Sequence, residues 1–322
     1  MIGSYEGPYF DDLEAGAVFT APAYTLTDGR AAVHQSILGS RLPLTLDTDL
    51  AMGVAGLCLA DPGFVWDVAI GQSTVVTQRV IANLFYRGLA FHRLPAIGDT
   101  LRTRTEIVGL RQNASRPSGM AALRITTIDQ HERPVLDFWR CAMLPLRDES
   151  VRTGHSDDLS SLGHEPDIQP LIDMLGTWDL ARWAPPEGPA VGVGATWASS
   201  SGELVSGAAE LARLTLNLAH VHHDQYSRPG GRLVYGGHTI GLALTQVAKA
   251  LPQLITVAGW RGCDHTGPVR EGDTLYSEIT VEAARAVGDQ GLRAVDLRVI
   301  VKARDASTSR DVLDWRPIVI LR

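Results

Sequence analysis

The chain has 322 residues, of which 45% are hydrophobic and 20% are charged, a composition typical of a soluble globular protein with room for two domains. Its formal net charge of −7 argues against binding to the phosphate backbone of nucleic acids, which requires a basic surface. The three cysteines, Cys58, Cys141 and Cys263, are far apart, which argues against a disulfide framework and favours a reducing cytoplasm.

The N-terminal stretch MIGSYEGPYFDDLEAG has acidic residues where a secretory signal has a basic start and an apolar core. No apolar run reaches the roughly 18 residues of a membrane helix. We therefore expect a cytoplasmic protein that binds neither membrane nor nucleic acid.

An internal repeat divides the chain into two similar halves. LGSRLPLTLD (38–47) aligns with TLNLAHVHHD (215–224). GDTL (98–101) recurs at 272–275, and VLDFW (135–139) recurs as VLDWR (312–316). Three matches in the same order and at nearly the same spacing indicate a duplication.

The region between the repeats is polar and contains Pro, Gly and Ser, which is typical of a linker. We expect a short helix within IQPLIDMLGTWDLARW (168–183). The predicted organisation is an N-terminal domain over 1–150, a linker over 151–190 and a C-terminal domain over 191–322.

The second repeat has the pattern of a buried helix followed by strands. Within HTIGLALTQVAKALPQL (238–254), apolar side chains recur at helical spacing and also cover the remaining faces. Alternating, β-branched segments follow at 274–284, 292–305 and 310–321. These patterns predict an α+β domain in which a curved antiparallel sheet wraps a central helix, with two copies pairing their sheets as a pseudo-dimer.

Three segments of the second half resemble the MaoC-like (R)-specific enoyl-CoA hydratases. They are NLAHVHHD (217–224), VYGGHTIG (234–241) and GPVREGDTL (267–275). LGSRLPL, IANLFYRG, IGDTL and VGLRQN are similar to the double-hotdog mesaconyl-CoA hydratases, and actinobacterial double-hotdog proteins of unassigned substrate are also similar. The resemblance covers both halves apart from the linker and implies a double hotdog fold.

The resemblance implies reversible hydration of a 2-enoyl-CoA to a 3-hydroxyacyl-CoA. His222 takes the position of the acid–base catalyst, and Asn217 stands where the family has a catalytic Asp and is expected to orient water. Backbone N–H groups near Gly236 and Gly237, at the start of the central helix, are expected to form the oxyanion hole. Tyr235 replaces the histidine of the family's His-Gly turn.

Other residues near these segments are expected to contact the substrate. They are Tyr235, Gly236, His238, Asp264 and His265. Asp224 and Asp264 are also candidates to assist proton transfer.

In the first repeat, Ser40 and Thr45 align with Asn217 and His222. Neither hydroxyl is a general base near neutral pH, so we expect one active site per chain. The N-terminal half is then a scaffold that shapes the substrate tunnel.

The histidine cluster also has a metal-binding interpretation. His220-x-His222-x-Asp224 matches most of the His-x-His-x-Asp-His signature of metallo-β-lactamase-type hydrolases, but Gln225 occupies the last position. We therefore expect no metal and no cofactor, with a CoA thioester as substrate. A polar segment without chemistry is the remaining interpretation of the cluster.

Two further functions remain open from the sequence. A non-catalytic acyl-CoA-binding protein is favoured by Asn217 and by the first repeat's lack of acid–base groups. An acyl-CoA thioesterase is the enzymatic alternative, because hotdog domains also support that chemistry. The expected partner is a small acyl-CoA molecule, and the sequence leaves open a homodimer of the double hotdog.

Overall fold

A twelve-stranded antiparallel sheet dominates the structure, a computed structural model that describes residues 7–305 and 308–322. Across the sheet, the strands are β1 (Val18–Thr20), β4 (Thr100–Gln112), β5 (Ser118–Ile128), β6 (Pro134–Pro145), β3 (Ala82–Phe91), β9 (Leu254–His265), β12 (Ser309–Leu321), β11 (Leu292–Arg304), β10 (Thr274–Val287) and β7 (Thr196–Ala198). Strand β2 (Tyr24–Thr25) pairs with β4, and β8 (Glu203–Leu204) pairs with β10. The predicted α+β double hotdog is confirmed.

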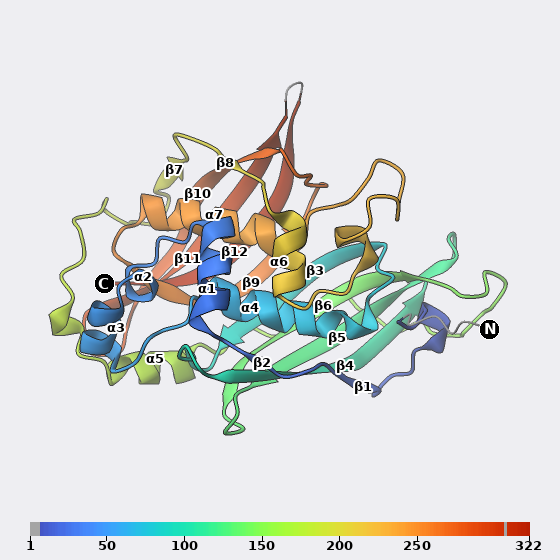
Figure 1. Ribbon diagram of the computed structural model, residues 1–322, viewed down its shortest axis with the longest axis horizontal. Helices are drawn as coiled ribbons and strands as arrows, with labels where there is room; N and C mark the ends of the chain where they lie inside the picture. Colours follow the sequence, from blue (N-terminus) through green and yellow to red (C-terminus); the bar gives the residue numbers. More distant parts are fainter. Residues whose placement is uncertain (1–6, 306–307) are drawn as a thin grey trace.

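The main helices lie together on one face of this sheet (Figure 1). They are α1 (Asp28–Leu38), α2 (Pro43–Leu46), α3 (Thr48–Ala55), α4 (Pro62–Gln72), α6 (Ala208–Leu214) and α7 (Gly236–Ala250). Helix α5 (Gln169–Gly176) and the 3-10 turns η1 (Phe10–Asp12), η2 (Ser73–Val76), η3 (Leu180–Arg182) and η4 (His220–His222) complete the secondary structure. No helix in the described ranges is both long and apolar enough to cross a membrane.

The two halves join where β3 pairs with β9. Tyr86 lies opposite Cys263 in this antiparallel pairing, so the sheets of both repeats form one continuous sheet. Three buried indoles pack behind the junction: Trp66 of α4 lies 4.9 Å from Trp260 of β9 and 6.2 Å from Trp315 of β12, measured between ring centroids. This arrangement confirms that the two copies pair their sheets.

Helices α4 and α7 are equivalent to each other, because each is the central helix of one repeat. Every residue of α4 is buried, which explains why its sequence has no polar face. The predicted helix over 238–254 corresponds to α7, which begins at Gly236 and ends at Ala250. It ends there because Pro252 lacks an N–H group and disfavours helical backbone at the residue before it.

The repeated GDTL motif makes the same turn in both halves. Asp99 Oδ2 accepts a hydrogen bond from the backbone N–H of Ala96 (2.9 Å), and Asp273 Oδ2 accepts one from Arg270 (2.8 Å). The glycines before these aspartates have φ angles of 101° and 93°, a conformation that L side chains rarely adopt. The motif thus recurs because each half needs this tight turn into a long strand.

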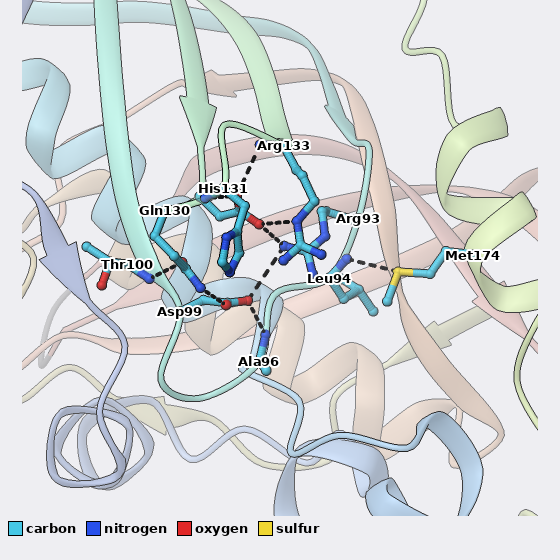
Figure 2. Close-up of polar contacts among 10 residues, drawn as sticks. Arg93, Leu94, Ala96, Asp99, Thr100, Gln130, His131, Arg133 and Met174 are labelled. Carbon is cyan, nitrogen blue, oxygen red and sulfur yellow. Dashed lines mark hydrogen bonds and ion pairs between the residues drawn. The ribbon is translucent and has the colours of Figure 1, made fainter.

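In the N-terminal half, this turn is part of a wider polar network (Figure 2). The other oxygen of Asp99 accepts a hydrogen bond from Gln130 (2.7 Å), and Arg93 forms an ion pair with Asp129 (2.5 Å). Met174 of α5 accepts a hydrogen bond from the adjacent backbone N–H of Leu94 (3.4 Å). The predicted short helix in the linker is therefore present as α5 and docks on the N-terminal half, while the domain boundaries at 150 and 190 stay a prediction.

We expect Asp99→Ala and Asp273→Ala each to lower the free energy of unfolding by about 1–3 kcal/mol, because each leaves a backbone N–H group without its acceptor. Denaturant titration monitored by circular dichroism measures the change. Glu187→Ala, at an exposed position, is the control and should change stability by less than about 0.5 kcal/mol. Losses no larger than that of the control would contradict this role of the two aspartates.

Candidate functional site

A cavity of about 330 Å³ lies between the two halves. Its wall includes residues of both repeats: Ile70, Thr74, Asn83, Tyr86 and Arg140 from the first, and Asn217, His222, Tyr235, Gly236 and His265 from the second. The two halves contribute different residues to this wall, and a separate cavity of about 240 Å³ in the first repeat is lined by residues that include His34, Thr45 and Asp61.

His222 reaches this cavity from η4 with one ring nitrogen engaged. Its Nδ1 lies 3.1 Å from the carbonyl oxygen of Leu233, and because a carbonyl only accepts, Nδ1 carries the proton. Nε2 then has a free lone pair. Burial lowers the pKa of His222 to about 4, so the ring is neutral near pH 7 and able to accept a proton. The ring also packs edge-on against Tyr235, with centroids 5.7 Å apart.

Asn217 is buried, with 2% of its surface exposed, and its orientation follows from one hydrogen bond. Its Oδ1 accepts from the backbone N–H of Ala219 at 2.9 Å, which identifies the oxygen and leaves the NH₂ group as a donor. An amide donor and an unprotonated imidazole therefore line the same cavity. Together they offer a water molecule one donor and one acceptor.

The segment that carries both residues is held by contacts with the other repeat. The backbone N–H of Leu218 donates to Thr74 Oγ1 (2.8 Å), and that of His220 donates to the carbonyl oxygen of Gln78 (2.9 Å). Nε2 of His223 lies 2.5 Å from the carbonyl oxygen of Asn217.

Within residues 7–305 and 308–322, no group of three His, Cys, Asp or Glu side chains is arranged to hold a metal ion.

The start of α7 brings backbone close to buried polar side chains. A Cβ atom at Gly236 would lie 2.5 Å from His265 Nε2, and one at Gly237 would lie 2.0 Å from Asp67 Oδ1, so neither position accommodates a side chain. The Tyr235 hydroxyl lies 3.3 Å from Asp67 Oδ1 and donates to it. Burial raises the pKa of Tyr235, so the hydroxyl stays protonated. Tyr235 acts here as a neutral donor and not as an acid–base group.

Asp67 links the two central helices through a buried pair in the first repeat. Its Oδ2 lies 3.0 Å from His34 Nε2, and both side chains are at most 2% exposed. Burial raises the pKa of Asp67, while the hydrogen bonds from His34 and Tyr235 oppose that shift. The pair anchors the N-terminal end of α7 and does not line the cavity.

The structure places two of the residues expected to contact substrate outside the wall of this cavity. His238, in the first turn of α7, has no surface exposed and does not line the cavity. Asp264 is an outward-facing strand residue that forms an ion pair with Arg87 at 2.7 Å. Asp224 is exposed and also lies outside the cavity wall. His265, by contrast, lines the cavity, and burial lowers its pKa to about 4.

The equivalent region of the first repeat holds different chemistry. Ser40 donates to Asp61 Oδ2 at 2.5 Å, and Thr45 lies 3.4 Å from the same oxygen. Asp61 is the N-cap of α4 and also accepts from the backbone N–H of Gly63 at 2.7 Å. The Ser40 hydroxyl thus binds the N-cap carboxylate of α4, and the Thr45 hydroxyl also donates to the carbonyl oxygen of Leu42 (3.0 Å).

Sequence reasoning did not identify the cavity residues of the first repeat, above all Asn83, Tyr86 and Arg140. One signal was present: in VLDFWRCAML, the period-two alternation places Arg140 on the same face as the buried Phe138. A charged residue at an inward-facing position of a core strand is unusual. No comparable sequence pattern distinguishes Asn83 or Tyr86.

Comparisons with known proteins agree with this architecture. No protein-family model matches the chain. It is 29% identical to a β-methylmalyl-CoA dehydratase of Chloroflexus aurantiacus, with 91% of this chain and 88% of the relative aligned. It is 27% identical to a mesaconyl-CoA hydratase of Cereibacter sphaeroides, over 91% of this chain and 89% of the relative.

Two solved structures superpose on nearly the whole chain, each with a TM-score of 0.88. The first is a conserved protein of Mycobacterium tuberculosis described as a double hotdog fold, which is 53% identical and is covered to 99%, with 98% of this chain aligned. The second is described as a MaoC domain protein dehydratase from Chloroflexus aurantiacus, which is 26% identical, with coverage of 100% of this chain and 99% of the other.

We expect stability to fall as the pH drops from 6.5 toward 4. Burial lowers the pKa of His222, His238 and His265 to about 4, so the unfolded chain binds more protons in this window. His238→Leu should reduce the slope of unfolding free energy by about 1 kcal/mol per pH unit between pH 5 and 6. It should be tolerated at pH 7, because neither ring nitrogen has a hydrogen-bond partner among the described residues.

Urea titrations of the wild type and His238→Leu at pH 7, 6 and 5 measure this slope. Equal slopes in the two proteins would show that His238 is not held neutral by burial.

Proposed function

The chain belongs to the MaoC-like double-hotdog hydratase and dehydratase family, and from that premise we propose that it catalyses reversible hydration of a 2-enoyl-CoA thioester to a 3-hydroxyacyl-CoA. The observation that carries this proposal is the pairing of a neutral His222 with the amide of Asn217 in one cavity wall. A hydration needs a base for water, a proton for the α-carbon and a donor for the thioester oxygen.

Water attack at the β-carbon is the first step. His222 Nε2 accepts one proton of the water, while the Asn217 NH₂ group donates to the water oxygen and sets its orientation. Asn217 cannot take over as base, because an amide has no basic site near neutral pH. His222 is therefore the only acid–base group in this proposal.

Backbone N–H groups at the start of α7 stabilise the negative charge that develops on the thioester oxygen. Gly236 in the cavity wall carries no side chain that would block approach, Gly237 follows it in the first turn, and the helix N-terminus adds its dipole. The imidazolium of His222 then returns its proton to the α-carbon. The water's hydroxyl and one proton are thus added across the double bond, and dehydration is the same path reversed.

The relatives support a CoA thioester as substrate. The two curated relatives are named for β-methylmalyl-CoA and mesaconyl-CoA, and their alignments span both halves of this chain. At Asn217 the chain departs from the resemblance, because an amide replaces the family's catalytic Asp and can orient water but cannot accept its proton.

We expect His222→Ala to lower kcat/KM for a 2-enoyl-CoA by about 10²–10⁴-fold, the usual loss when a general acid–base group is removed. Loss of ultraviolet absorbance of the conjugated thioester measures hydration. Asn217→Ala should cause a smaller loss, because the base is still present. His220→Ala, from the same segment, is the control and should retain wild-type activity.

Equal rates in the wild type and His222→Ala would contradict the role of His222. Release of free CoA without a hydrated product would instead identify a thioesterase. Binding of CoA thioesters without turnover of any member of a substrate panel would identify a non-catalytic binding protein.

The pH dependence of kcat/KM offers an independent check. Because burial lowers the pKa of His222 to about 4, the base stays unprotonated as the pH falls from 7 to 5. Activity should then fall only as the pH passes through about 4, well below the 6.5 of an ordinary histidine. In Asn217→Asp, the new carboxylate favours the imidazolium, so the acid limb should move to higher pH. An acid limb at 6.5 in the wild type would contradict the assignment.

A further inference from the structure

His265 is a second histidine in the cavity wall, and it belongs to the sheet. It is the last residue of β9 and pairs with Leu313 of β12. Because side chains alternate along a strand, His265 faces the opposite side from its neighbour Asp264, which forms the outward ion pair with Arg87. The imidazole of His265 therefore lies on the inner side of the sheet, where it lines the same cavity as His222.

The repeated fold does not require a histidine at the end of this strand. His265 stands seven residues before the GDTL motif at 272–275, and Phe91 stands seven residues before the GDTL motif at 98–101. Phe91 is likewise the last residue of its strand, β3, and it is fully buried against Trp66. A phenyl ring thus satisfies the packing at this position in the first repeat. The imidazole in the second repeat is a feature of the cavity and not of the scaffold.

The surroundings of the two ring nitrogens of His265 determine which one carries the proton. Nε2 is buried without a hydrogen-bond partner among the described residues, and a Cβ atom at Gly236 would lie 2.5 Å from it. Gly236 is the first residue of α7, so Nε2 lies at the positive end of the helix dipole, which favours a lone pair over an N–H group. The proton of the neutral ring is therefore on Nδ1. Because Nε2 is enclosed, Nδ1 is the nitrogen that the cavity can reach.

The proposed hydration leaves a place for such a donor beside α7. A carbonyl oxygen has lone pairs for two donors. Gly236 lines the cavity, whereas Gly237 does not. The hydroxyl of Tyr235, the residue before them, already donates to Asp67. His265 is the side chain that lies against Gly236 and still has a ring N–H group to offer.

We propose that the Nδ1–H group of His265 donates to the thioester oxygen beside Gly236, so that the oxyanion site combines an imidazole with the backbone of α7. This inference rests on the proposed function for the position of the thioester. His265 transfers no proton: its hydrogen bond strengthens as negative charge develops on the oxygen and weakens again when the α-carbon is protonated. Burial lowers the pKa of His265 to about 4, so the ring remains a neutral donor at pH 7.

The two histidines of the cavity then present opposite groups to the substrate. His222 has its Nδ1–H engaged with the carbonyl oxygen of Leu233 and offers the lone pair of Nε2. His265 has its lone pair directed at the start of α7 and offers an N–H group. One ring accepts the proton of water, and the other stabilises the charge that this attack sends to the thioester oxygen.

Two other donors of the cavity wall have to be distinguished from His265. The terminal nitrogens of Arg140 donate to the hydroxyls of Ser73 and Thr77, each at 2.8 Å, and are therefore engaged. The ring of Tyr86 packs edge-on against His265, with centroids 6.0 Å apart, which makes its hydroxyl the competing donor. Tyr86→Phe removes that hydroxyl and keeps the ring, so it is the matched comparison.

Infrared spectroscopy of a bound, unreactive thioester tests the proposal without turnover. Butanoyl-CoA and butanedioyl-CoA, each labelled with a heavy carbon isotope at the thioester carbonyl, are saturated and cannot be hydrated. Binding to the wild type should lower the carbonyl stretching frequency below that of the thioester in water, because preorganised donors polarise the carbonyl. His265→Phe should raise the frequency again, and His265→Gln should keep part of the shift, since its amide also donates. His131→Phe, at an exposed position outside the cavity, should match the wild type.

The rate of hydration gives a second measurement of the same hydrogen bond. We expect His265→Phe to lower kcat by about 10²–10³-fold for the 2-enoyl-CoA that the wild type hydrates, the usual effect of losing one oxyanion donor. KM should change little, because the donor acts mainly on the charge of the transition state. His265→Gln should recover part of the loss in kcat.

The outcomes separate this inference from the proposed function. An equal carbonyl frequency in the wild type and His265→Phe would overturn the inference even if the wild type hydrates enoyl-CoAs. A shift that is lost in Tyr86→Phe and persists in His265→Phe would assign the donor to Tyr86 and overturn it as well. A shift that depends on His265, in a protein that hydrates no enoyl-CoA, would support the donor and reject only the hydratase activity. A wild type that binds neither thioester would overturn both.

Nitrogen NMR of the wild type keeps the inference testable if His265→Phe does not fold. In protein labelled with a heavy nitrogen isotope in histidine, the signals of His265 are those missing from His265→Gln. We expect Nδ1 to be protonated and Nε2 to be unprotonated at pH 7, with the Nδ1 signal changing when a thioester binds. A proton on Nε2 would leave a lone pair facing the cavity and would overturn the inference.

Discussion

The antiparallel pairing of β3 with β9 is the contact on which the rest of the structure depends. It joins the sheets of the two repeats, and the indoles of Trp66, Trp260 and Trp315 pack directly behind it. The same pairing brings Tyr86 of the first half next to the strand that carries His265. The cavity exists because these two half-sheets meet with their central helices on the same side.

The duplication has left the two halves with different tasks. In the second half, the segment before the central helix carries His222 and Asn217, which face the cavity. In the first half, the corresponding hydroxyls of Ser40 and Thr45 bind Asp61 at the N-cap of α4. The first half lines the cavity with other side chains, among them Arg140, whose aligned residue in the second half is Pro317. The two copies of one fold thus contribute different side chains to the same cavity.

Burial controls the chemistry of this site. It keeps the imidazoles of His222 and His265 neutral and the phenol of Tyr235 protonated, so these groups act as acceptors and donors without net charge. Against this neutral background, Arg140 and Arg228 in the cavity wall are the exceptions. A cation in a low-dielectric wall interacts strongly with a nearby anion, because little solvent is available to screen it. The cavity wall thus carries positive charge even though the chain as a whole is acidic.

The sequence alone determined the duplication, the double hotdog fold and the location of the candidate catalytic segment. The duplication follows from motif order and the α+β class from helical and strand periodicity. The double hotdog fold and the candidate residues Asn217, His222 and Gly236 follow from the resemblance of short motifs to a known family. Only the tertiary structure decided which side chains share the cavity. In the structure, His238 lies in the core and Asp264 pairs with Arg87 on the outward face of its strand. Arg140 lies in the cavity wall that His222 also lines. Contacts between residues this far apart in the chain depend on how the sheet closes, which no local pattern encodes.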